Sequence, residues 1–307
     1  MRPPGKPKIL ISFAYYYKTD IDRLVGGFNE PPFCLADSGA FSAMTVGKPI
    51  GVENYARWLK RWKHNFDGYF NLDVIRDHKQ SERNLQRLKA HGLDPIPVFH
   101  TGSPWEVLDD LCSRYPLIGL GGMAGKHMSI DTLKNWLVHC FRIAREHGTK
   151  FHGLGMTTVK LNAALPFYSI DSTSWVAGVR FGSLFLWDGH GKLVQTWIGG
   201  KSNEKGKKTL GRGARLIREM GFDPNVCLPD NYDWTVACNM GAVAYIQYGE
   251  WLRKRHGPVG VEGLDDGLNL CIVGGSAQVL GHAFDIGGSK EAVKAWSKTL
   301  NHEEAYL

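Results

Sequence analysis

Short apolar runs that end in a polar residue or a glycine recur through the first 190 residues of this chain. The clearest lies within Phe33–Phe41, FCLADSGAF, where four apolar residues lead to Asp37 and then to Ser38 and Gly39. Such a run is typical of a strand that is buried on both faces, as in a parallel sheet. We expect seven further strands, at Lys8–Phe13, Phe70–Asp73, Ile96–Phe99, Leu117–Leu120, Phe151–Met156, Phe167–Asp171 and Val179–Trp187.

Segments with helical spacing of apolar residues alternate with these runs. Helices are predicted at Val52–Lys63, Ser81–His91, Pro104–Arg114, Ile130–His147 and Thr158–Ala164. Alternating strands and helices require parallel strands that are joined by crossover helices. An open, doubly wound sheet would fit this pattern. Eight candidate strands, many with a polar residue at the end, favour an α/β fold of the (β/α)8 TIM barrel type.

The pattern changes after about residue 190. Gly199–Arg215 is rich in glycine and basic residues, and it is predicted to be an exposed loop that leads into a helix. Trp234–Arg255 is predicted to be mostly helical, Leu268–Ile272 to be a possible further strand, and Gly287–Leu300 to be a final helix. We therefore expect a barrel core over residues 1–190 and a C-terminal part over residues 191–307 that packs on it.

Three of the predicted strands end in aspartate, namely Asp37, Asp73 and Asp171. In a barrel the carboxyl ends of all strands converge on one face, so these side chains would share a pocket. Several carboxylates around a pocket suit glycosyl chemistry, because one can attack the anomeric carbon, another can move protons and a third can hold ligand donors. A single aspartate at a strand end often only caps the next turn. Three at one rim favour an active site.

Other residues are candidates for binding. His100 follows an apolar strand and would read a base or transfer a proton, although a buried structural histidine is an equal alternative. Gly121 and Gly122 would let backbone amides approach a ligand closely. The basic residues after the barrel would grip phosphates, unless they form an ordinary solvated loop. These residues are Lys201, Lys205, Lys207, Lys208, Arg212 and Arg215.

Composition adds a few limits. The chain has 307 residues, 43% hydrophobic and 22% charged, which is ordinary for a globular protein. It has neither a run of apolar residues long enough for a membrane span nor a signal peptide, so no membrane association is expected. Its six cysteines are scattered without a CxxC pair, which favours a reducing compartment, the cytoplasm, and argues against a local zinc site. The net charge of +7 suits a polyanion as partner but is weak support.

Several of these motifs, in this order, resemble the tRNA-guanine transglycosylases, the family of the queuine tRNA-ribosyltransferases. These enzymes are (β/α)8 barrels that exchange guanine for a 7-deazaguanine base. DSGAF at Asp37 resembles the family's DSG(G/A)F motif, and GGMAG at Gly121 resembles its GGLAVG loop. HGLGM, which ends at Met156, is similar to the strand whose methionine packs on the base. SIDS contains Asp171 where the family has its nucleophile.

The resemblance covers roughly residues 8 to 190 and implies roles for individual residues. Asp171 would be the nucleophile and Asp37 the proton shuttle. Asp73 corresponds to a second guanine-binding aspartate, and His100 falls near the position of a base-reading glutamine. The substrate-binding residues implied are Ser38, Gly39, Asp73, His100, Gly121, Gly122 and Met156.

Two departures from the family pattern affect the expected substrate. The family's zinc motif is missing, and Ser42 stands where a glutamine follows DSGAF. The pattern is most similar to the phage-borne DNA 7-deazaguanine transglycosylases (the DpdA family). This resemblance implies DNA as the partner, a 7-deazaguanine base such as 7-cyano-7-deazaguanine as co-substrate, and the host cytoplasm as the compartment if a phage encodes the protein.

The mechanism implied is base exchange on a guanosine that is taken out of the base stack. Asp171 would attack the sugar, guanine would leave, and the covalent glycosyl-aspartate would be captured by the incoming deazaguanine. No metal or redox cofactor is needed. The alternatives are a tRNA-guanine transglycosylase, a barrel hydrolase that releases a base or sugar to water, and a nucleic-acid-binding protein that has lost its activity.

Overall fold

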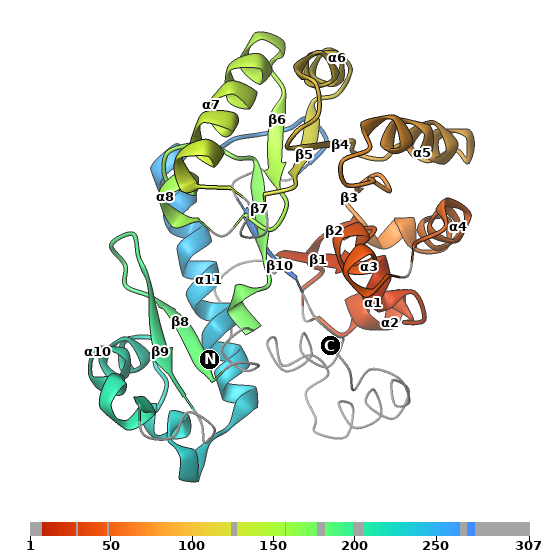
Figure 1. Ribbon diagram of the computed structural model, residues 1–307. Helices are drawn as coiled ribbons and strands as arrows, with labels where there is room; N and C mark the ends of the chain where they lie inside the picture. Colours follow the sequence, from red (N-terminus) through yellow and green to blue (C-terminus); the bar gives the residue numbers. More distant parts are fainter. Residues whose placement is uncertain are drawn as a thin grey trace.

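The computed structural model describes residues 8–28, 30–47, 49–123, 128–156, 158–176, 182–198, 205–264 and 269–273. About half of these residues are helical, and the larger sheet has eight parallel strands in the order β3-β2-β1-β10-β7-β6-β5-β4 (Figure 1). The predicted α/β class with parallel strands is therefore confirmed. The strands are β1 (Lys8–Ser12), β2 (Phe33–Asp37), β3 (Gly68–Tyr69), β4 (Val98–His100), β5 (Leu117–Gly121), β6 (Lys150–Gly153), β7 (Ser169–Ser172) and β10 (Asn269–Val273).

Burial on both faces explains the continuous apolar runs. In β2, Phe33 and Leu35 belong to one small buried cluster, whereas Cys34 and Ala36 on the opposite face belong to the main core. The small cluster also contains Phe70 and residues from β1 and β4. Because β2 packs against an apolar cluster on each face, it can hold a polar residue only where it ends, at Asp37.

The two outermost strands in this order, β3 and β4, also meet. Phe70, just after β3, and Ile96, just before β4, form an isolated parallel bridge. The amide of Asn71 donates to the carbonyl of Ile96, and the amide of Ile96 donates to the carbonyl of Tyr69, both at 2.8 Å. The outer strands are therefore in contact with each other as well as with their neighbours in the sheet.

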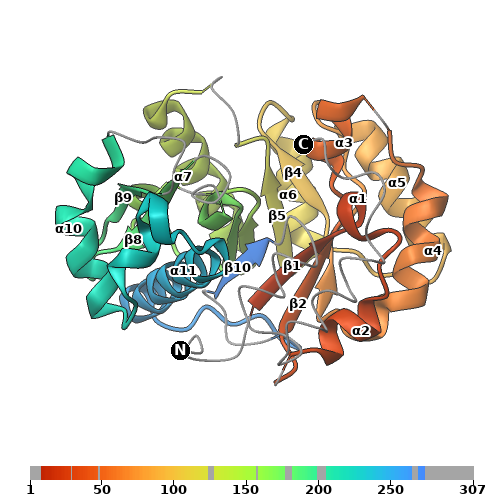
Figure 2. The same ribbon diagram turned by 90° about the horizontal axis from the view of Figure 1, so that it is seen from below.

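Helices follow most of these strands. The helices before residue 170 are α1 (Phe13–Tyr16), α2 (Ile21–Gly26), α3 (Ala40–Val46), α4 (Val52–Trp62), η1 (Lys63–Asn65), α5 (His78–Ala90), α6 (Trp105–Arg114), α7 (Ile130–His147) and α8 (Val159–Asn162). In the view of Figure 2, α2, α4 and α5 lie together at one side of the sheet and α10 and α11 at the other. The predicted alternation of strands and helices is confirmed for this part of the chain.

The helix ends were predicted with mixed success. The predicted bounds of α7 are confirmed: the Ser129 hydroxyl accepts from the Thr132 amide at 3.1 Å and caps its start, and Gly148, with φ of 77°, ends it. Helix α5 begins three residues earlier than predicted, because the Asp77 carboxylate accepts from the Gln80 amide and caps it there. Helix α6 begins at Trp105, one residue later than predicted, with Pro104 as its N-cap residue.

The part of the chain after β7 requires a correction. The run predicted as the eighth strand, Val179–Trp187, contributes β8 (Ser183–Trp187), which pairs antiparallel with β9 (Leu193–Trp197) in a separate two-stranded sheet. The turn is made at Asp188, whose carboxylate accepts from the amides of His190 and Lys192 and folds the chain back. The eighth parallel strand is β10, between β1 and β7, so the possible strand at Leu268–Ile272 is confirmed.

The remaining elements join the hairpin to β10. They are α10 (Lys205–Glu219), η3 (Pro224–Cys227), η4 (Pro229–Asn231) and α11 (Trp234–His256). Figure 1 shows α11 running beside β8 and α10 beside β9. The segment predicted to be a loop up to Arg215 is helical from Lys205, and the predicted helix Gly287–Leu300 lies outside the described residues. Within the described ranges, no helix is long and apolar enough to cross a lipid bilayer.

Candidate active site

The three predicted aspartates lie toward the carboxyl ends of parallel strands. Asp37 is the last residue of β2, Asp171 is the third residue of β7, and Asp73 follows β3 by four residues. Burial and the negative charges of Asp73 and Asp171 raise the pKa of Asp37 to about 7, although a hydrogen bond from the Gly39 amide opposes the rise. The carboxyl ends of parallel strands lie at the same edge of a sheet, so the fold brings the three carboxylates to one edge.

Asp73 is held by two side chains. Its Oδ2 lies 2.7 Å from His100 Nε2, and its Oδ1 accepts a hydrogen bond from the Ser38 hydroxyl at 3.4 Å. All three residues are buried. Nε2 of His100 is thus hydrogen-bonded to Asp73, so this histidine orients the Asp73 carboxylate.

Asp171 has a different arrangement. Its Oδ1 lies 3.2 Å from His152 Nε2 and accepts a hydrogen bond from the Gly155 amide at 2.8 Å. Among the described residues, none donates a hydrogen bond to Oδ2. Within the described residues, the carboxylate is therefore anchored through one oxygen, which leaves the other as the candidate nucleophile.

Neither His152 nor Ser169 could be assigned a role from the sequence. His152 Nδ1 lies 2.7 Å from the Ser169 hydroxyl, and the two residues are opposite each other in the register of β6 and β7. Ser169 and Asp171 are two residues apart and so share a face of β7. That spacing was visible in SIDS, but the partner strand was needed to show that His152 lies against both.

Glycines allow the chain to pass close to the site. Gly39 has φ of 76°, and a Cβ there would collide with the Ala14 side chain. A Cβ on Gly121 would lie 3.0 Å from Cε1 of His100. Gly122 has φ of 75°. The loop GGMAG was expected to contact a base, but its last two residues, 124 and 125, lie outside the described residues. Met156 is buried, as a methionine that packs beneath a ligand would be.

Five of the six predicted phosphate-binding residues lie on α10. Lys201 is outside the described residues, whereas Lys205, Lys207 and Lys208 fall in the first turns of the helix. Arg212 pairs with Asp188 at 3.0 Å and Arg215 with Glu219 at 3.5 Å. The two arginines thus already have carboxylate partners, which weakens their case as phosphate ligands.

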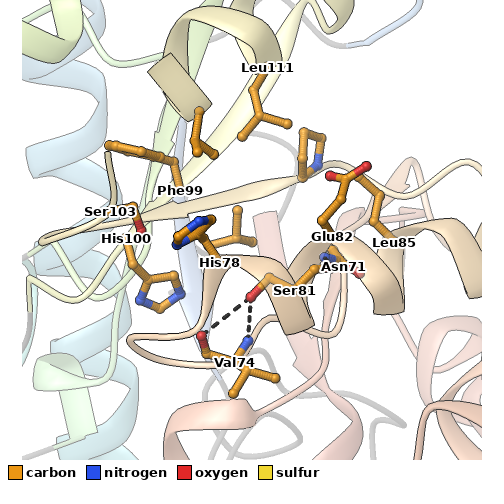
Figure 3. A pocket seen from close by; sticks show the side chains of 13 residues that line it. Asn71, Val74, His78, Ser81, Glu82, Leu85, Phe99, His100, Ser103 and Leu111 are labelled. Carbon is orange, nitrogen blue, oxygen red and sulfur yellow. Dashed lines mark hydrogen bonds between the residues drawn. The ribbon is translucent and has the colours of Figure 1, made fainter. Parts of the chain in front are cut away.

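Neither of two described cavities contains the three aspartates. Figure 3 shows a small pocket of about 20 Å³ between α5, α6 and β4, lined by residues that include Asn71, His78, Ser81 and His100. A space of that size holds about one water molecule. A groove of about 680 Å³ lies beside Lys150 and Pro166, at the starts of β6 and β7 and so at the opposite edge of the sheet from the aspartates.

Comparison with known proteins adds no family. No family model matches the chain, and no curated protein matches it. In the part of the chain that is described, no group of three or more His, Cys, Asp or Glu side chains is arranged to hold a metal ion.

Proposed function

We propose that this protein is a base-exchanging glycosyltransferase that replaces guanine in DNA with a 7-deazaguanine base. The observation that carries the proposal is the group of three carboxylates at the carboxyl edge of one parallel sheet, in which Asp37 has a pKa raised to about 7. We further propose that the eight strands form a (β/α)8 barrel. The contact between the outer strands β3 and β4 supports this, because it joins the two ends of the strand order.

The first step proposed is attack by Asp171. Its Oδ2 forms a bond to C1′ of the target nucleoside while the C1′–N9 bond breaks, and the bonding electrons leave with guanine. The sugar must be presented outside the base stack for this attack. The two hydrogen bonds on Oδ1 support the role, since they fix the carboxylate without using the oxygen that attacks.

Asp37 is the proton shuttle in this proposal. A carboxyl group with a pKa of about 7 is about half protonated at neutral pH, so it can give a proton to the departing guanine. Ionised Asp37 then takes the proton of the incoming 7-deazaguanine as that base attacks C1′ and releases Asp171. Asp37 thus gives up one proton and takes one back in each round of exchange.

Asp73 and His100 are proposed to hold the base. The N–H groups of guanine can donate hydrogen bonds to a carboxylate. His100, whose Nε2 lies 2.7 Å from Oδ2 of Asp73, keeps this carboxylate turned toward the site. Ser38 supports the second oxygen. This pairing assigns base recognition to Asp73 directly and to His100 through Asp73.

A competition experiment tests the proposal. Purified protein is incubated with DNA and tRNA in one tube, with labelled 7-cyano-7-deazaguanine, and nucleosides from each polymer are analysed by mass spectrometry. We expect label in DNA only, and none with Asp171→Asn, which cannot form the glycosyl-aspartate. Label in tRNA only would show the tRNA-guanine transglycosylase alternative. Release of guanine without added deazaguanine would show a hydrolase, and no product in any arm would refute the proposal.

A further inference from the structure

His152 is fully buried in β6, and both of its ring nitrogens have partners. Nε2 lies 3.2 Å from Oδ1 of Asp171, and Nδ1 lies 2.7 Å from the hydroxyl of Ser169. The ring of Phe70 packs against the imidazole with 4.8 Å between centroids. A ring that is enclosed and bonded at both nitrogens has one orientation.

The partners also determine where the proton lies. An ionised carboxylate only accepts hydrogen bonds, so Nε2 of His152 must carry the proton that points to Asp171. In a neutral ring Nδ1 is then an acceptor, and the Ser169 hydroxyl can donate to it. Ser169 is 1% exposed and is opposite His152 in the strand register. The carboxylate therefore selects the tautomer, and the Ser169 hydroxyl, which can donate or accept, adjusts to it and holds the ring at Nδ1.

The contact with His152 fixes the rotation of the Asp171 carboxylate about its side-chain bonds. His152 and the Gly155 amide both bond to Oδ1, from β6 and from the turn that follows it. Without His152 the carboxylate would keep one backbone donor and could turn about its side-chain bonds. A reacting atom that is displaced by about 1 Å loses rate by a factor of about 100.

We propose that His152, oriented by Ser169, is a positioning residue that directs Oδ2 of Asp171 toward the sugar. The inference rests on the proposed function, because it assigns His152 a role in that reaction. It concerns the rate of attack and not the binding of substrate, since His152 is closed off from the site by its own burial.

Two substitutions of His152 separate positioning from packing. In His152→Gln the amide nitrogen reaches roughly the position of Nε2 and still donates to Asp171, whereas His152→Leu cannot donate. We expect kcat of base exchange to fall about 100-fold in His152→Leu and less than about 10-fold in His152→Gln, with KM little changed in both. Equal losses in the two variants, or no loss in His152→Leu, would overturn the positioning role.

Ser169→Ala provides a second variant in case the histidine variants unfold. It leaves the imidazole in place but removes its partner at Nδ1, so kcat should fall about 10-fold as the ring loses one of the two hydrogen bonds that orient it. Thermal unfolding followed by circular dichroism shows whether each variant is folded. A folded Ser169→Ala protein with unchanged kcat would contradict the assigned role of the serine.

A spectroscopic measurement separates this inference from the proposed function. ¹⁵N NMR of the His152 ring should show a proton on Nε2 alone in the wild type, and in Ser169→Ala a changed Nδ1 chemical shift that reports the lost hydrogen bond. A wild-type protein that has this tautomer but exchanges no base would refute the proposed function. A wild-type protein that exchanges base with the proton of His152 on Nδ1 would refute the inference and leave the proposed function standing.

Discussion

Three carboxylates at one edge of a sheet repel one another when all are ionised, and in this protein the pKa of Asp37 is the one that is raised. Asp73 has His100 and Ser38 as partners, and Asp171 has His152 and the Gly155 amide. Burial is the largest cause of the raised pKa of Asp37, followed by the charge of Asp73, while the hydrogen bond from Gly39 only partly opposes them. The proton therefore resides on the carboxyl group that the proposed reaction needs as an acid.

A pH profile tests this assignment. We expect kcat/KM of base exchange to fall above about pH 7 as Asp37 loses its proton. After burial, the charge of Asp73 is the largest cause of the raised pKa of Asp37. Asp73→Asn removes this charge, so kcat/KM should begin to fall at a lower pH in that variant. Asp94→Asn, at an exposed carboxylate before β4, is the matched control and should leave the profile unchanged. A profile that Asp73→Asn does not shift would argue against Asp37 as the acid.

The free energy of unfolding should also depend on pH through Asp37. The folded-state pKa of Asp37, about 7, lies above the ordinary value of 3.8, so its contribution to stability is complete below pH 3.8 and is lost as the pH rises to about 7. Asp37→Asn has no such loss. We expect the variant to have nearly the wild-type free energy of unfolding at pH 4 and to exceed it at pH 8 by on the order of 2 kcal/mol. Urea unfolding at the two pH values measures the difference, and an equal difference at both would contradict the raised pKa.

The sequence was informative about residues at strand ends and less so about their neighbours. Asp37 and Asp171 could be predicted because each is the first charged residue at the end of a run that is buried on both faces. His152 could not, because its role depends on the register that sets it against Ser169. Strand register between segments that are far apart is set by packing of the whole sheet, so no local pattern encodes it.

At the scale of elements, an apolar run predicts a strand but not its partner. The run that contains β8 predicts a strand of the parallel sheet, yet Asp188 turns the chain directly into β9, and the two strands pair with each other. The glycines and basic residues of Gly199–Arg215 predict an exposed loop that leads into a helix, yet the chain is helical already from Lys205. Tertiary packing of α10 on β9 outweighs the low helix propensity of those glycines.

Helix α10 has its own testable role. If Lys205, Lys207 and Lys208 contact phosphates, replacing all three with alanine should weaken DNA binding alike for all sequences. The slope of log Kd against log salt should decrease by roughly one unit for each lost contact. Replacing Lys60, Arg61 and Lys63 of α4 and η1 with alanine removes the same charge from an exposed surface elsewhere. Fluorescence anisotropy of labelled DNA measures both, and equal effects of the two triple variants would mean that only net charge matters.

At the scale of the whole molecule, the two ends of the described chain meet in one sheet. Strand β10 lies between β1 and β7, with Ile9 opposite Ile272 and Ser169 opposite Asn269. The expected division at residue 190 stays a prediction, but the parallel sheet does take one strand from beyond it. Alternation of strands and helices predicted a parallel sheet correctly. It could not show that the chain makes an excursion through β8, β9, α10 and α11 before adding the last strand.

This arrangement predicts that residues 1–190 are not an independent folding unit. A chain that ends at residue 190 lacks β10, so β1 and β7 each lose a strand neighbour and expose backbone donors and acceptors. We expect that fragment to aggregate or to unfold without a cooperative transition, and a chain that ends at residue 264 to do the same. Adding residues 191–307 as a separate polypeptide should restore cooperative unfolding to the fragment. Size-exclusion chromatography and thermal melts followed by circular dichroism decide the question: a monomeric 1–190 fragment that melts cooperatively would mean that the sheet is stable without β10 and that the boundary at residue 190 is a true domain boundary.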